Sequence, residues 1–99
     1  MNQYAIYQVP FENDLIRDIS FMTPAEIEKV SDQYELVATM RAENLEQVFH
    51  FGNMGNHPID RVGEMHSVSV GDIIHNFDTD ETFVVARFGF EKINMKEAA

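Results

Sequence analysis

The sequence predicts an α+β domain, with a mainly antiparallel sheet of four to five strands and two short helices packed on one face. Three observations lead to this class. The chain has 99 residues, of which 44% are hydrophobic, and this is enough for one core. Runs of alternating apolar and polar residues recur along it, and two short segments between them have the period of a helix. Residues 1–99 are therefore expected to form a single domain.

The first half of the chain is expected to begin with a strand, a helix and a second strand. Residues 3–9 are rich in aromatic and β-branched residues and end at Pro10, which predicts a strand. Thr23-Pro24-Ala25-Glu26 predicts a helix start, because this spacing allows a capping box and proline suits the first helical position. A strand over 34–40 is expected to have one face formed by Tyr34, Leu36, Ala38 and Met40, and the other by Glu35, Val37 and Thr39.

The rest of the chain predicts a helix, a loop and further strands. Leu45, Val48 and Phe49 recur at helical spacing, and Gly52 is expected to cap the end of this helix. Residues 52–63 are rich in glycine and asparagine and are interpreted as a loop. Strands over 65–70 and 72–77 are expected on the two sides of a tight turn at Gly71-Asp72, and a last strand over 81–90 after an acidic turn at 78–81.

The chain is strongly acidic. It has 17 aspartates and glutamates against 7 lysines and arginines, for a formal net charge of −10. This charge disfavours direct binding to nucleic acid, where basic side chains must displace counterions. The acidity either keeps the protein soluble or imitates the charge of DNA and occupies a DNA-binding protein. The carboxylates assigned to that second interpretation are Glu43, Glu46, Asp78, Asp80 and Glu81.

No targeting or membrane segment is expected. The chain contains no cysteine, which excludes disulfides and thiolate metal ligands. No stretch approaches the roughly 20 apolar residues that span a bilayer, and the N-terminus has no basic region of the kind that begins a signal peptide. We therefore expect a cytoplasmic protein without a membrane partner.

The sequence contains no motif that predicts catalysis or a cofactor. Ser67 and Ser69 stand near His66, but no G-x-S-x-G motif surrounds either serine, and strand alternation explains their spacing. The 4 histidines do not have the i, i+4 helical spacing of a zinc motif, and the segment from residue 78 lacks the glycine and glutamate of a calcium-binding loop. We expect neither an enzyme nor a bound metal.

The loop over 52–63 and the end of the preceding helix form the candidate partner-binding surface. Its proposed residues are Phe51, Met54, His57 and Ile59. Three of them, Phe51, Met54 and Ile59, place apolar side chains in or beside a segment of glycines and asparagines. The alternative is that these apolar residues fold back as a lid on the core. Most phenylalanines, including Phe49, Phe51, Phe83, Phe88 and Phe90, are expected in the core, with one or two of them exposed.

Four segments appear in a recognisable order: "YELVATM", "LEQVFHFGN", "HPIDRVGEMHSVSVGDII" and "FVVARFGFEKI". Over about residues 34–93 this pattern resembles the YodL-like domain, a small family typified by a sporulation-expressed Bacillus protein and also found in large polyvalent proteins of phages and conjugative elements. The residues that carry the resemblance are Leu45-Glu46, Phe49, His57-Pro58, Gly63, Ser67-Val68-Ser69-Val70, Asp72-Ile73-Ile74 and Phe88-Gly89-Phe90.

The resemblance implies a protein-interaction role. No catalytic residues are attached to the family, and the Bacillus member is associated with the actin-like cytoskeleton of cell-wall synthesis. Together with the sequence features, this favours a noncatalytic protein-binding module, as an accessory protein of a phage or mobile element that modulates a host factor. An acidic DNA mimic that inhibits a nucleic-acid-binding or restriction system is the alternative.

Overall fold

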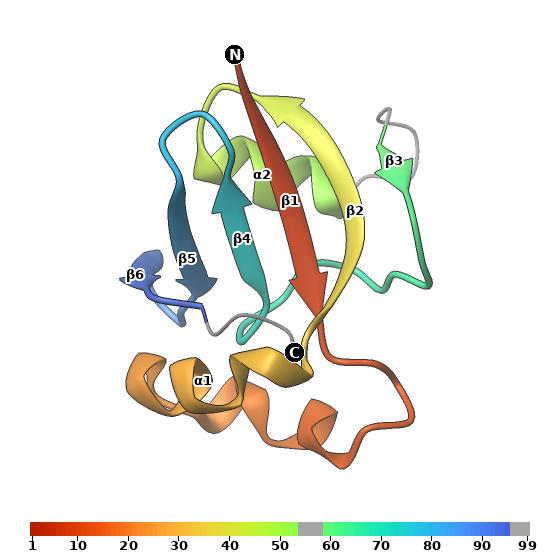
Figure 1. Ribbon diagram of the computed structural model, residues 1–99, viewed down its shortest axis with the longest axis vertical. Coiled ribbons are helices and arrows are strands. Elements are labelled where there is room, and N and C mark those ends of the chain that lie inside the picture. Colours follow the sequence, from red (N-terminus) through yellow and green to blue (C-terminus); the bar gives the residue numbers. More distant parts are fainter. Residues whose placement is uncertain (54–58, 96–99) are drawn as a thin grey trace.

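The computed structural model describes residues 1–53 and 59–95 (Figure 1). In this part of the chain, six strands form one antiparallel sheet in the order β3-β2-β1-β4-β5-β6. The strands are β1 (Asn2–Gln8), β2 (Glu35–Ala42), β3 (Asp60–Arg61), β4 (Ile73–Asn76), β5 (Glu81–Val85) and β6 (Phe90–Ile93). The helices are α1 (Pro24–Val30) and α2 (Leu45–Gly52), with short 3-10 helices η1 (Asp14–Arg17), η2 (Ile19–Phe21) and η3 (Ser31–Gln33).

The α+β class and the antiparallel sheet are confirmed, but the sheet has more strands than the four to five expected. One addition is β3, a two-residue strand inside the segment interpreted as a loop, which pairs with Ala38 and Thr39 of β2. The other is β6, because the strand expected over 81–90 is a hairpin. There, Ala86 N donates to Gly89 O at 2.9 Å, and Gly89 has a φ of +90° that reverses the chain.

The turn at Gly71 is confirmed, but only one strand adjoins it. Gly71 has a φ of +97°, and β4 begins two residues later. Residues 65–70 form no strand, although Val68 is buried while Ser67 and Ser69 are exposed. The alternation is confirmed over Ser67, Val68 and Ser69, whereas the expected strand over 65–70 is wrong. Side-chain hydrogen bonds, described below, hold this segment instead.

An irregularity in β2 changes which of its residues are buried. The register with β1 shifts between Ile6 and Tyr7, whose partners are Ala38 and Leu36, respectively. Val37 is thus the extra residue of a β-bulge. Val37 is 4% exposed and joins the core, whereas Leu36 is 39% exposed. The strict alternation predicted for residues 34–40 is wrong at these two positions.

Both predicted helices are present. The capping box of α1 is confirmed, because Glu26 N donates to Thr23 Oγ1 at 3.2 Å and Thr23 N donates to Glu26 Oε1 at 2.9 Å. At the other helix, Gly52 is the last residue of α2 and Asn53 is its cap. Gly52 is therefore not the cap that the sequence predicted. A glycine is needed there for packing, since a Cβ atom would overlap Cγ2 of Val68.

The two helices cover opposite faces of the sheet. Ile74 of β4 belongs to an apolar cluster with Val48 of α2, and its neighbour Ile73 belongs to a second cluster with Ile27 of α1. Successive residues of a strand point to opposite faces. In Figure 1, α2 lies behind the sheet and α1 lies below it. The packing of both helices on one face is therefore a wrong prediction: the central strands are apolar on both faces, and both need cover.

Candidate functional site

The segment from His66 to Asp72 is fastened to β1 by a buried polar network. Asp72 is fully buried, and its Oδ2 accepts hydrogen bonds from Gln8 Nε2 at 3.0 Å and Ser69 N at 2.9 Å. Gln8 also donates to His66 O at 2.9 Å, while its Oε1 accepts from His66 N at 3.2 Å. The hydroxyl of Tyr34 donates to Gly71 O. These bonds replace the missing strand ladder.

Burial controls the electrostatics of this network. It raises the pKa of Asp72 to about 6, although the bonds from Ser69 and Gln8 and the charge of His66 oppose the rise. Burial also raises the pKa of Tyr34 above its ordinary value, with a contribution from Asp72. Within the described residues, Asp72 Oδ1 and His66 Nε2 are buried without a hydrogen-bond partner. The network is a folding element that is sensitive to the protonation of Asp72.

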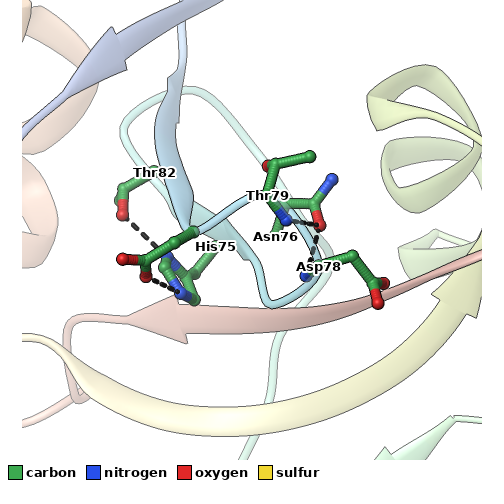
Figure 2. Close-up of polar contacts among 6 residues, drawn as sticks. His75, Asn76, Asp78, Thr79 and Thr82 are labelled. Atoms are coloured by element: carbon green, nitrogen blue, oxygen red, sulfur yellow. Dashed lines mark hydrogen bonds and ion pairs between the residues drawn. The ribbon is translucent and has the colours of Figure 1, made fainter.

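A hydroxyl, an imidazole and a carboxylate meet at the turn between β4 and β5 (Figure 2). His75 Nδ1 lies 2.8 Å from Thr82 Oγ1, and His75 Nε2 lies 3.3 Å from Asp80 Oδ1. In a serine-protease triad the hydroxyl faces the substrate and the carboxylate orients the base from behind. Here Thr82 is 8% exposed and the Asp80 side chain 93% exposed, the reverse of that arrangement.

The same turn is closed by further local bonds. Asn76 Oδ1 accepts from the backbone nitrogens of Asp78 and Thr79 at 2.9 and 3.2 Å (Figure 2). Asp78 in turn accepts from Gln3 N at 2.7 Å, and Asp80 has a φ of 58°. The acidic turn predicted at 78–81 is confirmed, and its polar side chains shape the turn. Across the described ranges 1–53 and 59–95, no three histidine or acidic side chains are placed to hold a metal ion.

Of the predicted partner-binding residues, Phe51 and Ile59 lie in the described part of the chain. Phe51 and Ile59 are half-buried and pack against the core cluster beneath α2, as the lid interpretation expected. Met54 and His57 lie outside the described residues. The apolar character of the loop is thus explained at Phe51 and Ile59 by packing.

The carboxylates of the acidic interpretation also have individual roles. Glu81 pairs with Lys92 at 3.2 Å. Hydrogen bonds from Thr79 and Lys92 lower the pKa of Glu81. Asp78 and Asp80 close the turn described above. Glu43 lies just before α2 and Glu46 lies in its first turn, and both are exposed.

An apolar groove lies between α2 and the β5–β6 hairpin. It has a volume of about 310 Å³. Its lining is largely apolar and includes two charged side chains. The lining residues are Glu46, Phe49, Val85, Ala86, Arg87, Gly89 and Phe90. Phe49 of α2 is 38% exposed.

A second groove, of about 210 Å³, lies on the other side of the same hairpin. It shares Val85, Ala86 and Arg87 with the first groove and is also lined by Phe21, whose side chain is 75% exposed. Phe88 follows Arg87 at the hairpin tip and is 96% exposed. We call Phe21, Phe49, Arg87 and Phe88 the hairpin surface. It combines three exposed aromatic rings with a basic side chain, the residue types enriched at protein interfaces.

The sequence prediction identified the possibility of an exposed phenylalanine but not its position. Phe51, Phe83 and Phe90 are half-buried, as expected of core residues, whereas Phe49 and Phe88 are exposed. The available signal was Arg87-Phe88-Gly89, which interrupts the strand pattern with a charged residue and a glycine. That signal indicates a turn, and a turn places its side chains in solvent.

Comparison with known families decides the relationship that the sequence motifs suggested. The family model for the YodL-like domain matches residues 3–95. The chain belongs to the YodL-like domain family. No curated protein matches it significantly, and neither does any solved structure. Within the described ranges, no helix is long and apolar enough to cross a membrane.

Several of the residues that carry the YodL-like resemblance lie in two places in the described structure. Those from Ser67 to Ile74 surround the buried Asp72 network. Glu46, Phe49 and Gly89-Phe90 line the groove beside the hairpin, with Phe88 at its tip. The first group therefore holds the fold together, and the second contributes to the hairpin surface and to the groove next to it.

Proposed function

We propose that this YodL-like domain is a noncatalytic, cytoplasmic protein-binding module and that the hairpin surface is its binding face. The setting we propose is an accessory protein of a phage or another mobile element that modulates a host protein. The observation that supports the binding role is Phe88, which is 96% exposed at the hairpin tip, next to a largely apolar groove on one side and a mixed polar and apolar groove on the other.

Energetics favour this assignment of Phe88. A phenylalanine stabilises a fold by removing its ring from water, and a ring that is 96% exposed contributes little in that way. The same ring gains that free energy when a partner covers it. Aromatic and arginine side chains at the centre of an interface supply most of its binding energy. Arg87 stands next to Phe88 and lines both grooves.

The DNA-mimic alternative depends on the acidic surface. The net charge of −10 supports it. Asp78 and Glu81, however, already accept a hydrogen bond or pair with a basic group inside the domain. A phosphate mimic needs carboxylates that are available to a partner's lysines and arginines. The hairpin surface is therefore the better supported binding face.

Affinity capture from a lysate of the source cells tests the proposal. The bait is the full chain, as wild type, Phe88→Asp or Val62→Asp. Val62 is the matched control, because it is 61% exposed and follows β3 at the opposite edge of the sheet. We expect Phe88→Asp to lose proteins that wild type and Val62→Asp capture, at both low and high salt. Capture that survives Phe88→Asp but is lost at high salt and on substitution of Glu43 or Glu46 would replace this proposal with the acidic alternative.

A further inference from the structure

We propose that a second copy of this chain occupies the groove between α2 and the β5–β6 hairpin, so that Phe88 of each copy inserts into the groove of the other. This inference rests on the proposed function, since it uses the hairpin surface as a protein-binding face. It adds that the occupant of the groove is a second copy of the chain, and that Arg87 of one copy pairs with Glu46 of the other.

The first argument is that a protruding ring and an apolar groove lie next to each other. Phe88 is 96% exposed at the hairpin tip. The groove is lined by the residues on either side of it in the chain, Arg87 and Gly89, and by Phe49 and Phe90. Phe88 itself does not line the groove. A surface that carries both a projection and a matching hollow can bind a copy of itself through a two-fold axis, with each projection in the other copy's hollow.

The second argument is charge complementarity. The groove is lined by one acidic residue, Glu46, and one basic residue, Arg87. Neither forms an ion pair within residues 1–53 and 59–95, with each other or with another side chain. In a two-fold arrangement, the Arg87 that accompanies an inserting Phe88 meets Glu46 of the receiving copy. Two such pairs form, one at each groove, and they fix the orientation of the contact.

The hairpin can present Phe88 in this way because of its turn. Gly89 has a φ of +90°, and no atom of the described residues lies within 4 Å of the position of its Cβ. The bond from Ala86 N to Gly89 O closes the turn behind the exposed ring. The projection is therefore held by a hydrogen-bonded hairpin at the edge of the sheet, and little order has to be gained on binding.

Sedimentation equilibrium of the full chain, from micromolar to millimolar concentration, tests the inference. We expect a monomer–dimer equilibrium that Phe88→Asp weakens at least about tenfold and that Val62→Asp leaves unchanged. Glu46→Arg and Arg87→Glu should each weaken the dimer, and the double variant Glu46→Arg/Arg87→Glu should restore it. Thermal unfolding of each variant establishes that it is folded.

Disulfide trapping gives a second measurement that does not depend on lost binding. The chain has no cysteine, so a mixture of Phe49→Cys and Phe88→Cys chains should form a mixed disulfide faster than either forms with Val62→Cys. A wild type that is monomeric throughout, or a dimer that Phe88→Asp leaves unchanged, overturns the inference. If the monomer still loses captured cellular proteins on Phe88→Asp, the proposed binding role stands without the dimer. If the wild type is monomeric and Phe88→Asp captures the same cellular proteins as wild type, both the dimer and the proposed binding role are contradicted.

Discussion

The two segments that carry the family pattern differ in where their side chains point. Around Gly71-Asp72 they point inward: Asp72 is 0% exposed and is bonded to Gln8 and Ser69. At the β5–β6 hairpin they point outward, and Phe88 is 96% exposed. In one small domain, residues of the family pattern thus hold the fold together in one segment and are exposed to solvent in the other. Substitutions in the first segment should alter stability, and those in the second should alter binding.

The largest effect on stability is expected for Gly71→Ala, and Gly89→Ala is its control. Both glycines have positive φ, +97° and +90°. A Cβ at Gly71 would lie 2.9 Å from the backbone and side chain of Ile19, whereas no described atom lies within 4 Å at Gly89. Backbone strain costs both variants about 1 kcal/mol or more, and overpacking adds roughly 1–3 kcal/mol at Gly71 alone. If both variants lose the same unfolding free energy in urea, the segment around Gly71 is not tightly packed against Ile19.

The next effect concerns pH and Asp72. Burial raises the pKa of Asp72 from 3.8 to about 6, so the folded state holds this proton more tightly than the unfolded state does. Its contribution to stability is therefore fully present below about pH 4 and is lost as the pH rises through 6. The free-energy difference between wild type and Asp72→Asn should change by roughly 2–3 kcal/mol across this range, in favour of wild type at the acidic end.

Denaturant unfolding of both proteins at several pH values checks this sign. The lowered pKa values of Glu26 and Glu81 act in the opposite direction, but they are common to both proteins and cancel in the difference. A difference that is constant with pH would mean that Asp72 is no harder to ionise in the folded domain than in the unfolded chain.

Thr23→Ala changes a residue outside both segments, and it provides a reference value for the loss of stability when one local hydrogen bond is removed. It removes the oxygen that accepts the bond from Glu26 N at the start of α1, and the bond is exposed. Loss of such a cap costs about 1 kcal/mol. We expect a smaller loss of stability than for Gly71→Ala, measured by the same unfolding experiment. A loss as large as that of Gly71→Ala would indicate that α1 supports the sheet more than its single cap suggests.

The smallest effect on stability is expected for Phe88→Ala. The ring is almost wholly in solvent, and surface substitutions of this kind usually change the unfolding free energy by less than about 0.5 kcal/mol. Phe90→Ala is the matched control, because Phe90 is half-buried and packs against the core cluster. A loss for Phe88→Ala as large as that for Phe90→Ala would contradict the outward assignment of the tip.

Local signals in the sequence predicted the local structure. Thr23-Pro24 with Glu26 located the start of α1, and Gly71 located a left-handed turn, because each depends on residues close in the chain. Features that depend on distant partners were missed. The bulge at Val37 is a matter of register with β1, and the short strand β3 exists because it pairs with β2. Neither leaves a periodic pattern within its own segment.

The hairpin surface could not be predicted from the sequence. The sequence directed attention to the loop over 52–63, since apolar residues among glycines indicate a binding loop, yet Phe51 and Ile59 pack against the core. The hairpin surface brings together residues of α2, the segment before α1 and the turn after β5. Only the tertiary fold places Phe49 and Phe21 on the two sides of Arg87.

The central claim is that the outward segment binds a protein, and photo-crosslinking tests it most directly. A photoreactive phenylalanine analogue is placed at residue 88 in one protein and at residue 62 in another, and both are irradiated in the source cells. Both positions are exposed, at opposite edges of the sheet. We predict crosslinks to a defined protein, either a second copy or a different chain, from position 88 and none from position 62. Crosslinks from position 62 alone, or none from position 88, would contradict the account.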